Sequence, residues 1–215
     1  LSGVRRTYAG MVAAMDEAVG QVIAALEEAK IRDNTLVIFS SDNGGPNPGR
    51  VTDNGPLRAG KGTIYEGGIR VCAAVNWPGH VPAGKTVAEP VQGVDWYPTL
   101  LKLAGGSLKQ KLPIDGMDIW RVITAGAKSP HDALLLCGTR PQVRAIRTGD
   151  WKLLVGAGAR DAEQSPDEAA FTNQAELFNL ANDPGEQHNL AGQYPEKVKE
   201  LLEQLDGLMK DAVVP

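Results

Sequence analysis

Apolar residues recur at intervals of three and four positions along the first part of the chain. This spacing places them on one side of a helix and predicts a long amphipathic helix from about Ser2 to Lys30. Gly20 interrupts the pattern, which lasts only about three heptads, so packing against a sheet is favoured over a coiled coil. The apolar stripe consists of Val4, Tyr8, Met11, Val12, Met15, Val19, Val22, Ile23 and Leu26.

A continuous apolar run follows from Thr35 to Phe39, after a short link. A run without alternation is typical of a buried strand in a parallel sheet that is covered on both faces. Helix, link and strand together predict an α/β layer. Ligand groups gather at the carboxyl ends of the strands in such sheets, and this strand leads directly to Asp42 and Asn43.

Asp42 and Asn43 form one part of a candidate metal site. A carboxylate and an amide carbonyl are hard oxygen donors of the kind that Ca²⁺ or Mg²⁺ binds, and Gly44-Gly45 lets the backbone turn away from the ion. Ca²⁺ takes roughly six to eight oxygens, so further ligands must come from elsewhere. The alternative is a turn without any ligand, since Asx-Gly pairs commonly form turns after a strand.

The next segment, from Pro46 to Gly62, is a long loop rich in Gly, Pro and Asn. Connections of this length are usually functional or disordered. Apolar patterning then predicts a strand from Val71 to Val75 and helices over Val94–Ala104 and Met117–Thr124. These elements continue the α/β portion, which we assign to residues 1–130.

Beyond Ser129 the pattern changes to short strands separated by turn signals, with a helix that begins at Pro195. This order predicts a small antiparallel sheet backed by a helix. We therefore assign residues 131–215 to a small α+β carboxyl-terminal subdomain, with a mobile loop from Gly156 to Thr172. The predicted strands are Leu134–Cys137, Val143–Arg147, Trp151–Val155 and Glu176–Leu180.

Composition narrows the class of protein. The chain has 215 residues and a formal charge of −4, without a cluster of Lys and Arg. It can bury a core, but it lacks the basic surface that nucleic-acid binding requires. No segment is expected to span a membrane, and no signal-peptide pattern is found at the amino end. The start at Leu1 without methionine suggests a portion of a longer protein.

Cys72 and Cys137 lie far apart in the sequence, each beside apolar residues, and neither belongs to a CxxC motif. Buried thiols are expected, with a single disulfide as the alternative.

Lys61 stands between two glycines in the loop that precedes Val71. No neighbouring side chain blocks its ammonium, which suits a bound sulfate or phosphate. The loop is not a Walker A motif, because Gly62 stands where the motif requires Ser or Thr. The alternative for a lysine in such a loop is a solvated side chain.

Further motifs accompany Asp42, Asn43 and Lys61, in a fixed order along nearly the whole chain. They are Tyr8-Ala9-Gly10-Met11-Val12, Met15-Asp16-Glu17-Ala18-Val19-Gly20, Leu57-Arg58, Glu66-Gly67-Gly68-Ile69-Arg70, Asp95-Trp96-Tyr97-Pro98-Thr99-Leu100, Asp115-Gly116, Trp151-Lys152-Leu153, Asn182-Asp183-Pro184-Gly185-Glu186 and Asn189-Leu190. Together they resemble the carboxyl-terminal portion of a type I sulfatase, and most of all the arylsulfatase B-like members.

The resemblance implies an alkaline-phosphatase-like α/β sandwich with a small carboxyl-terminal sheet domain. It implies a Ca²⁺ ion, in preference to Mg²⁺, held by Asp42 and Asn43 together with two acids of the amino-terminal half. Lys61 would bind the sulfate of an aryl or carbohydrate sulfate ester. A periplasmic, secreted or lysosomal location is also implied, although the sequence itself encodes none.

The nucleophile of the family is a formylglycine made from a Cys or Ser in a Cys/Ser-x-Pro/Ala-x-Arg motif of the amino-terminal half. The sequences after Cys72 and Cys137 do not match it. The family's early acids, first lysine and histidines also lie upstream. This chain is therefore expected to need the amino-terminal half for hydrolysis and to be inactive alone. Cys72 is itself a departure, because a proline usually follows Arg-Val in the family.

Two other functions remain open. A phosphodiesterase or phosphonate hydrolase of the same superfamily would more often hold transition metals through Asp and His, and no His stands beside Asp42. A non-catalytic binding module is the third possibility. The remaining polar residues are given structural roles: His80, His131 and His188 at surfaces or in loops, Glu66 as an anchor of its loop, and Arg50 and Asp53 as solvated positions or contacts to the leaving group.

Overall fold

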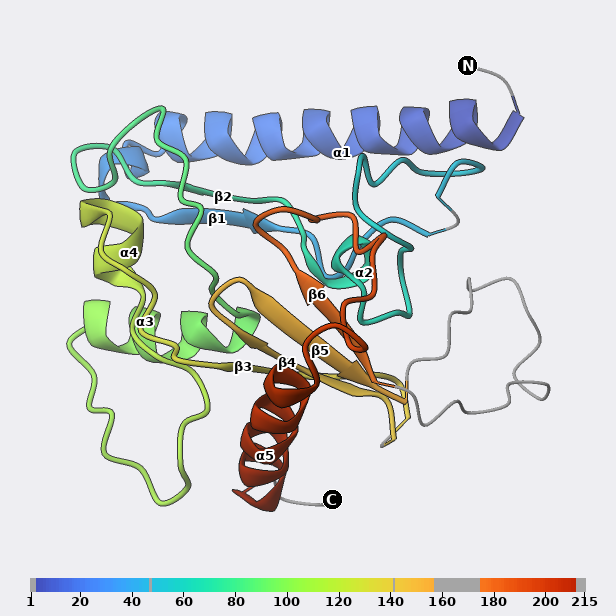
Figure 1. The fold of residues 1–215 in the computed structure, drawn as a ribbon. Helices are drawn as coiled ribbons and strands as arrows, with labels where there is room; N and C mark the ends of the chain where they lie inside the picture. The colour runs from blue at the N-terminus through green and yellow to red at the C-terminus, as the bar shows by residue number, and fades with distance from the viewer. Residues whose placement is uncertain (1–2, 47, 141, 157–174, 212–215) are drawn as a thin grey trace. The chain divides into compact units, whose positions relative to one another are not determined.

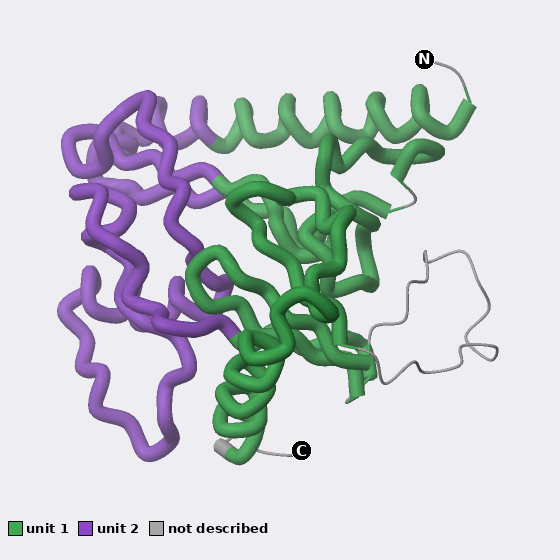
Figure 2. Tube along the Cα trace, viewed as in Figure 1, with its two compact units in different colours: residues 1–22, 40–73, 135–215 green, residues 23–39, 74–134 purple. Residues whose placement is uncertain are grey.

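The structure is a computed structural model that describes residues 3–46, 48–140, 142–156 and 175–211 (Figure 1). Of the loop predicted from Gly156 to Thr172, only Gly156 lies within the described residues. The chain forms two compact units (Figure 2), and each is described by itself. Unit 1 comprises residues 1–22, 40–73 and 135–215, and unit 2 comprises residues 23–39 and 74–134. The division at residue 130, inferred from the change of sequence pattern beyond Ser129, stays a prediction.

Helix α1 (Gly3–Glu28) confirms the amphipathic helix predicted from the spacing. Its apolar stripe is largely uncovered, with Val4 and Met11 exposed to 64% and 66%. By length and composition α1 is apolar enough to cross a membrane, although no apolar run of that length was expected; that no segment spans a membrane stays a prediction. Core helices of soluble proteins and signal sequences meet the same criterion.

The predicted strands on either side of the long loop pair with each other. Strand β1 (Val37–Ser40) and strand β2 (Ala73–Asn76) form a two-stranded sheet. Val37, Ile38 and Phe39 are half-buried in the described structure, rather than buried as a sheet covered on both faces would make them. The short 3₁₀ helix η1 (Arg32–Asn34) forms the link that precedes β1.

The helices predicted in unit 2 are present with small shifts at their ends. A 3₁₀ turn, η2 (Gly93–Asp95), leads into α3 (Trp96–Leu103), and α4 (Trp120–Ala125) follows. Pro98 lies in the first turn of α3, where its missing N–H costs nothing. Gly126 ends α4 in the left-handed conformation, with φ of 64°.

Asp95 organises the core of unit 2. Its side chain is fully buried, and Oδ2 accepts a hydrogen bond from Gln92 N (2.7 Å) while Oδ1 accepts one from Met117 N (2.9 Å). His131 Nε2 lies 2.9 Å from both carboxylate oxygens, and its side chain is only 5% exposed. The carboxylate therefore joins three separate segments of the chain.

Unit 1 contains a four-stranded sheet in the order β3-β4-β5-β6. The hairpin of β4 and β5 turns at Gly149, with φ of 56°, and pairs Thr148 with Trp151. Strand β6 pairs antiparallel with β5, so that Lys152 lies opposite Phe178. The predicted antiparallel sheet is thus confirmed. The strands are β3 (Leu134–Cys137), β4 (Arg144–Thr148), β5 (Trp151–Val155) and β6 (Glu176–Asn179).

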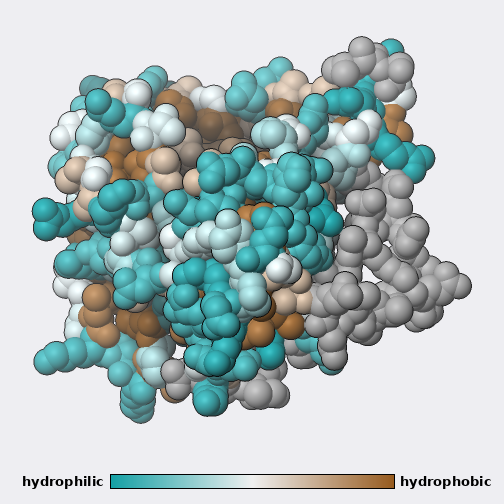
Figure 3. Space-filling view, in the orientation of Figure 1, coloured by the Kyte–Doolittle hydropathy of each residue, from teal (hydrophilic) through white to brown (hydrophobic). Residues whose placement is uncertain are grey.

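The two faces of this sheet are covered by different segments. Helix α5 (Pro195–Asp211) packs on β4 and β5 with Leu201 and Leu205 fully buried, and its outer surface is hydrophilic (Figure 3). The opposite face carries Ala145, Leu154 and Phe178, which pack with Ile64 and Tyr65. Ile64 and Tyr65 precede the short helix α2 (Glu66–Ile69), so the segment that follows Lys61 is part of the core.

Replacement of Asp95 by Ala should destabilise the protein strongly. The change removes the shared acceptor of two backbone N–H groups and His131, leaving them buried without a partner. We expect the free energy of unfolding of the full-length protein to fall by about 3–5 kcal/mol, the usual cost of breaking a buried polar pair. Thermal denaturation followed by circular dichroism measures this. Asp115→Ala, at an exposed aspartate of the same unit, is the control, and an equal melting temperature in both variants would contradict the role of Asp95.

Candidate active site

The turn after β1 presents oxygen donors without protein partners. Asp42 is exposed, and its carboxylate makes no hydrogen bond or ion pair with the residues that the structure describes. Asn43 uses its amide nitrogen, which donates to Gly44 O at 2.8 Å, and Ser41 Oγ donates to Asn43 O at 2.8 Å. The turn is thus fixed by its own hydrogen bonds, while the Asp42 carboxylate and Asn43 Oδ1 remain available to a ligand.

Lys61 stands on a neighbouring loop with its ammonium similarly available. The side chain is exposed and has no ion-pair partner among residues 3–46, 48–140, 142–156 and 175–211. Gly62 has φ of 87°, a conformation that favours glycine. Thr63 Oγ1 donates to Gly60 O at 2.8 Å, which closes the loop on itself. An ammonium presented in this way suits a tetrahedral oxyanion.

Backbone hydrogen bonds join the turn to the lysine loop. Lys61 N donates to Gly45 O at 3.2 Å, and Gly44 N donates to Gly68 O at 2.9 Å. The Asp42–Gly45 turn is therefore held between the loop that carries Lys61 and the helix α2 that follows it. The structure thereby brings together the segments that carry all three site residues predicted from the sequence.

Two glycines make this approach possible. A Cβ atom on Gly44 would overlap the carbonyl oxygen of Gly67, and a Cβ atom on Gly60 would overlap that of Gly45. Both obstacles are backbone atoms, which cannot rotate away as a side chain would. The glycines beside Asn43 and Lys61 are thus required by contact between two main chains, beyond any need for a flexible turn.

Asn54 links the same two segments and was missed by the sequence analysis. Its Oδ1 accepts from Gly45 N at 3.0 Å, while Nδ2 donates to Ala59 O at 2.8 Å and to Gly45 O at 3.2 Å. In the sequence it stands between Asp53 and Gly55, where it resembles an ordinary turn residue. Only the three-dimensional contact distinguishes it.

The predicted anchor Glu66 is buried in the structure, where it accepts a hydrogen bond from Lys152 Nζ at 2.9 Å. This contact fits the structural role given to it, as opposed to that of a base. Arg50 and Asp53 are exposed, and Asp53 Oδ1 accepts from Gly55 N at 2.9 Å. Their contact with a leaving group stays a prediction.

His131 lies in a loop, as expected, and its side chain is buried against Asp95. No sequence spacing signals this pairing, because the two residues are far apart in the chain. Cys72 and Cys137 are free thiols, as expected, but both are exposed instead of buried.

The donors present fit one part of a Ca²⁺ site. Asp42 and the amide oxygen of Asn43 are hard, unshared and adjacent, as Ca²⁺ requires. No group of three or more His, Cys, Asp or Glu side chains that could hold a metal occurs among the described residues. The remaining ligands would therefore have to come from residues outside this set.

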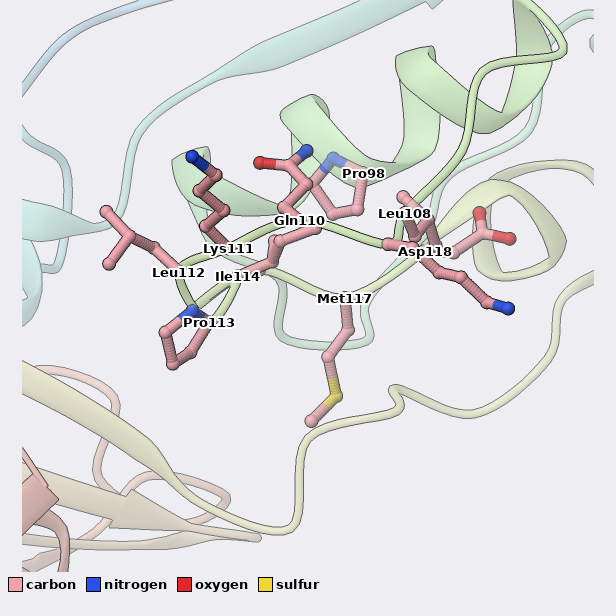
Figure 4. Close-up of a pocket in the computed structure, with 11 residues that line it drawn as sticks. Pro98, Leu108, Gln110, Lys111, Leu112, Pro113, Ile114, Met117 and Asp118 are labelled. Atoms are coloured by element: carbon pink, nitrogen blue, oxygen red, sulfur yellow. The ribbon is translucent and has the colours of Figure 1, made fainter.

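A surface pocket of about 720 Å³ lies apart from these residues in the sequence, within unit 2 (Figure 4). Pro98, residues 108–114 and residues 116–118 line it, and these combine the apolar side chains of Leu112, Ile114 and Met117 with the charged side chains of Lys111 and Asp118. None of the three predicted site residues contributes to its lining.

Comparison with known proteins identifies the family. The family model described as Sulfatase matches residues 2–107. Arylsulfatase J of Mus musculus is 35% identical over 246 residues, covering 97% of this chain and 40% of its own length. Arylsulfatase A of Homo sapiens is 35% identical over 209 residues, covering 90% of this chain and 41% of its own length.

Comparison with solved structures supports the same family assignment. The crystal structure of Ps i-CgsB in complex with k-i-k-neocarrahexaose has a TM-score of 0.79 and 34% identity, and the match covers 97% of this chain and 44% of that one. The predicted α/β sulfatase fold is confirmed by this likeness. This chain spans about 40% of the length of the curated relatives that it matches. The chain therefore belongs to the type I sulfatase family and corresponds to the carboxyl-terminal portion of its members.

Proposed function

We propose that the full-length protein hydrolyses sulfate esters, with Asp42 and Asn43 supplying part of a Ca²⁺ site and Lys61 binding the sulfate group. The observation that carries this proposal is the hydrogen-bonded junction between the Asp42–Gly45 turn and the Lys61 loop. It fixes two oxygen donors and one ammonium on adjoining backbone segments in a chain of the sulfatase family.

Lys61 would act on the charge that develops during cleavage. As the S–O bond of a sulfate ester lengthens, negative charge builds on the leaving oxygen and on the non-bridging oxygens. An ammonium already in place stabilises this charge without reorganisation in the transition state. Because Lys61 has no protein counter-ion among the described residues, its charge is available to the ester.

Asp42 and Asn43 would bind the cation from one side. When bound, Ca²⁺ would polarise the sulfate oxygens as a Lewis acid and add to the stabilisation of the developing charge. The protein's contribution is the fixed direction of the two donors, since Ser41 and Gly44 hold the turn. We propose Ca²⁺ in preference to Mg²⁺ because carboxylate and amide oxygens on a turn suit its flexible, high-coordination geometry.

The nucleophile would come from the remainder of the catalytic domain. Neither Cys72 nor Cys137 lies in the family's Cys/Ser-x-Pro/Ala-x-Arg motif, so this chain supplies cation and anion recognition without the attacking group. The substrate class is an aryl or carbohydrate sulfate ester. An oligosaccharide complex of a structural neighbour supports the carbohydrate class.

Replacement of Lys61 by Ala in the full-length enzyme should lower kcat/KM for an aryl sulfate by about 10²–10³, the usual cost of losing one preorganised electrostatic partner. The rate of sulfate release in the presence of Ca²⁺ measures this. Lys85→Ala, at an exposed lysine of unit 2, is the matched control. Equal activity of the two variants would show that Lys61 is a solvated side chain.

Replacement of Asp42 by Ala should remove bound Ca²⁺ together with activity, because the site loses its only charged donor from this turn. Elemental analysis of the desalted full-length protein measures the metal, and sulfate release measures the activity. Asp33→Ala, at an exposed aspartate, should retain both. Unchanged Ca²⁺ content in Asp42→Ala would overturn the metal assignment.

Two further outcomes would contradict the function itself. If the full-length enzyme cleaves phosphodiesters or phosphonates faster than sulfate esters, the alternative hydrolase of the same superfamily is correct. If the chain of residues 1–215 alone releases sulfate, the nucleophile does not lie in the remainder of the catalytic domain.

A further inference from the structure

A cluster of three buried charged side chains has no part in the chemistry described so far. The side chains of Lys152 and Glu186 are fully buried, and that of Glu66 is 3% exposed. Lys152 Nζ lies 2.9 Å from Glu66 Oε1 and 2.8 Å from Glu186 Oε1. Buried charges are costly unless they are paired, so such a cluster calls for an explanation.

The three residues come from three different segments of unit 1. Lys152 lies on β5, Glu66 begins α2, and Glu186 follows the Asn182–Gly185 turn. Lys152 stands opposite Phe178 on the face of the sheet that packs against Ile64 and Tyr65. The ammonium is therefore placed under the segment that links the Lys61 loop to α2.

Glu186 also holds Glu66 in place, through a second contact. Its Oε2 accepts a hydrogen bond from Glu66 N at 2.6 Å, so both the main chain and the side chain of Glu66 are tied to the cluster. Glu186 has φ of 52°, a conformation that non-glycine residues adopt only when their surroundings impose it. The turn is thus held in a strained conformation that brings its carboxylate to Glu66.

From Glu66 a short series of backbone contacts leads to the site. Gly67 N donates to Arg58 O at 2.8 Å, and Gly68 O accepts from Gly44 N at 2.9 Å. Gly44 follows Asn43, and Gly45 O in turn accepts from Lys61 N. Movement of α2 would therefore displace both the cation ligands and the lysine loop.

The charge balance makes Lys152 the central member. Two carboxylates share its single ammonium, and Arg70, whose Nη1 lies 3.9 Å from Glu66 Oε2, is half-exposed and more distant. Burial raises the pKa of Glu186, and the ammonium of Lys152 opposes this rise. Without Lys152 the two buried carboxylates would repel each other, and the anchor of α2 would open.

We propose that Lys152 is a positioning residue for the sulfate site: through Glu66 and Glu186 it fixes α2 against the carboxyl-terminal sheet, and thereby sets the positions of Asp42, Asn43 and Lys61. This inference rests on the proposed function. It gives the small carboxyl-terminal sheet a role in binding and turnover, although the sheet carries none of the proposed ligands.

The test compares two substitutions on one strand of the full-length enzyme. Lys152→Met removes the ammonium and keeps the length of the side chain, whereas Leu153→Ala removes buried volume on the opposite face of β5. Both should lower the melting temperature. Only Lys152→Met should lower kcat/KM and Ca²⁺ affinity by about 10- to 100-fold, as loss of a residue that orients metal ligands does. The assay temperature is set well below both melting transitions.

Amide hydrogen exchange provides a readout that needs no turnover. In Lys152→Met, exchange in the peptide covering residues 58–69 should rise above that in Leu153→Ala. If Lys152→Met does not fold, Glu186→Ala serves instead, because it removes both the acceptor of Glu66 N and one of the two carboxylates that contact Lys152. The same peptide should again exchange faster than in Leu153→Ala.

The outcomes separate this inference from the proposed function. An unmodified enzyme that releases no sulfate would overturn the function, while the exchange data would still decide whether Lys152 holds the loop. An active enzyme in which Lys152→Met matches Leu153→Ala in kcat/KM, Ca²⁺ affinity and exchange would overturn the positioning role alone.

Discussion

The close approach of two main chains at Gly44 is the constraint on which the candidate site depends. With no side chain on Gly44, its N–H reaches the carbonyl oxygen of Gly68, and a Cβ atom there would overlap Gly67. This contact fixes the direction in which the chain leaves β1. The orientation of Asp42 and Asn43 is therefore determined by the packing of α2, as much as by the strand that precedes them.

The small antiparallel sheet of unit 1 supports the packing of α2. One face takes helix α5, and the other takes Ile64 and Tyr65 from the segment just after Lys61. Arg58 reinforces this face, because its guanidinium stacks 4.0 Å from the centre of the Tyr65 ring and donates to Glu186 O at 3.0 Å. Tyr65 Oη donates to Glu176 Oε1 at 2.8 Å, and burial raises the pKa of Tyr65. The segment that follows Lys61 is thus part of the hydrophobic core of unit 1.

Local sequence patterns predicted most of the elements, because periodicity and turn residues act over short distances. The helix from Ser2 to Lys30, the hairpin around Gly149 and the helix from Pro195 all follow from such signals. The long-range pairs were not predictable in this way. From the sequence, Asn54 resembled a turn residue and His131 a surface or loop residue, and Lys152 was noted only as part of the Trp151-Lys152-Leu153 motif. The partners of each residue are brought near only by the fold. Exposure of Cys72 was missed for the same reason, since flanking apolar residues do not determine which side of a strand end faces solvent.

The shared ammonium of Lys152 also constrains how the sequences of such proteins can evolve. Positions 66, 152 and 186 lie far apart in the sequence, yet their buried side chains form one electrostatic unit in which a lost partner leaves a charge uncompensated. A neutral residue at position 152 would leave two buried carboxylates without a counter-ion, and would be tolerated only together with matching changes at positions 66 and 186. Among relatives these three positions should therefore vary as a set, and a carboxyl-terminal sheet exchanged between two sulfatases would have to bring its own partner for Glu66.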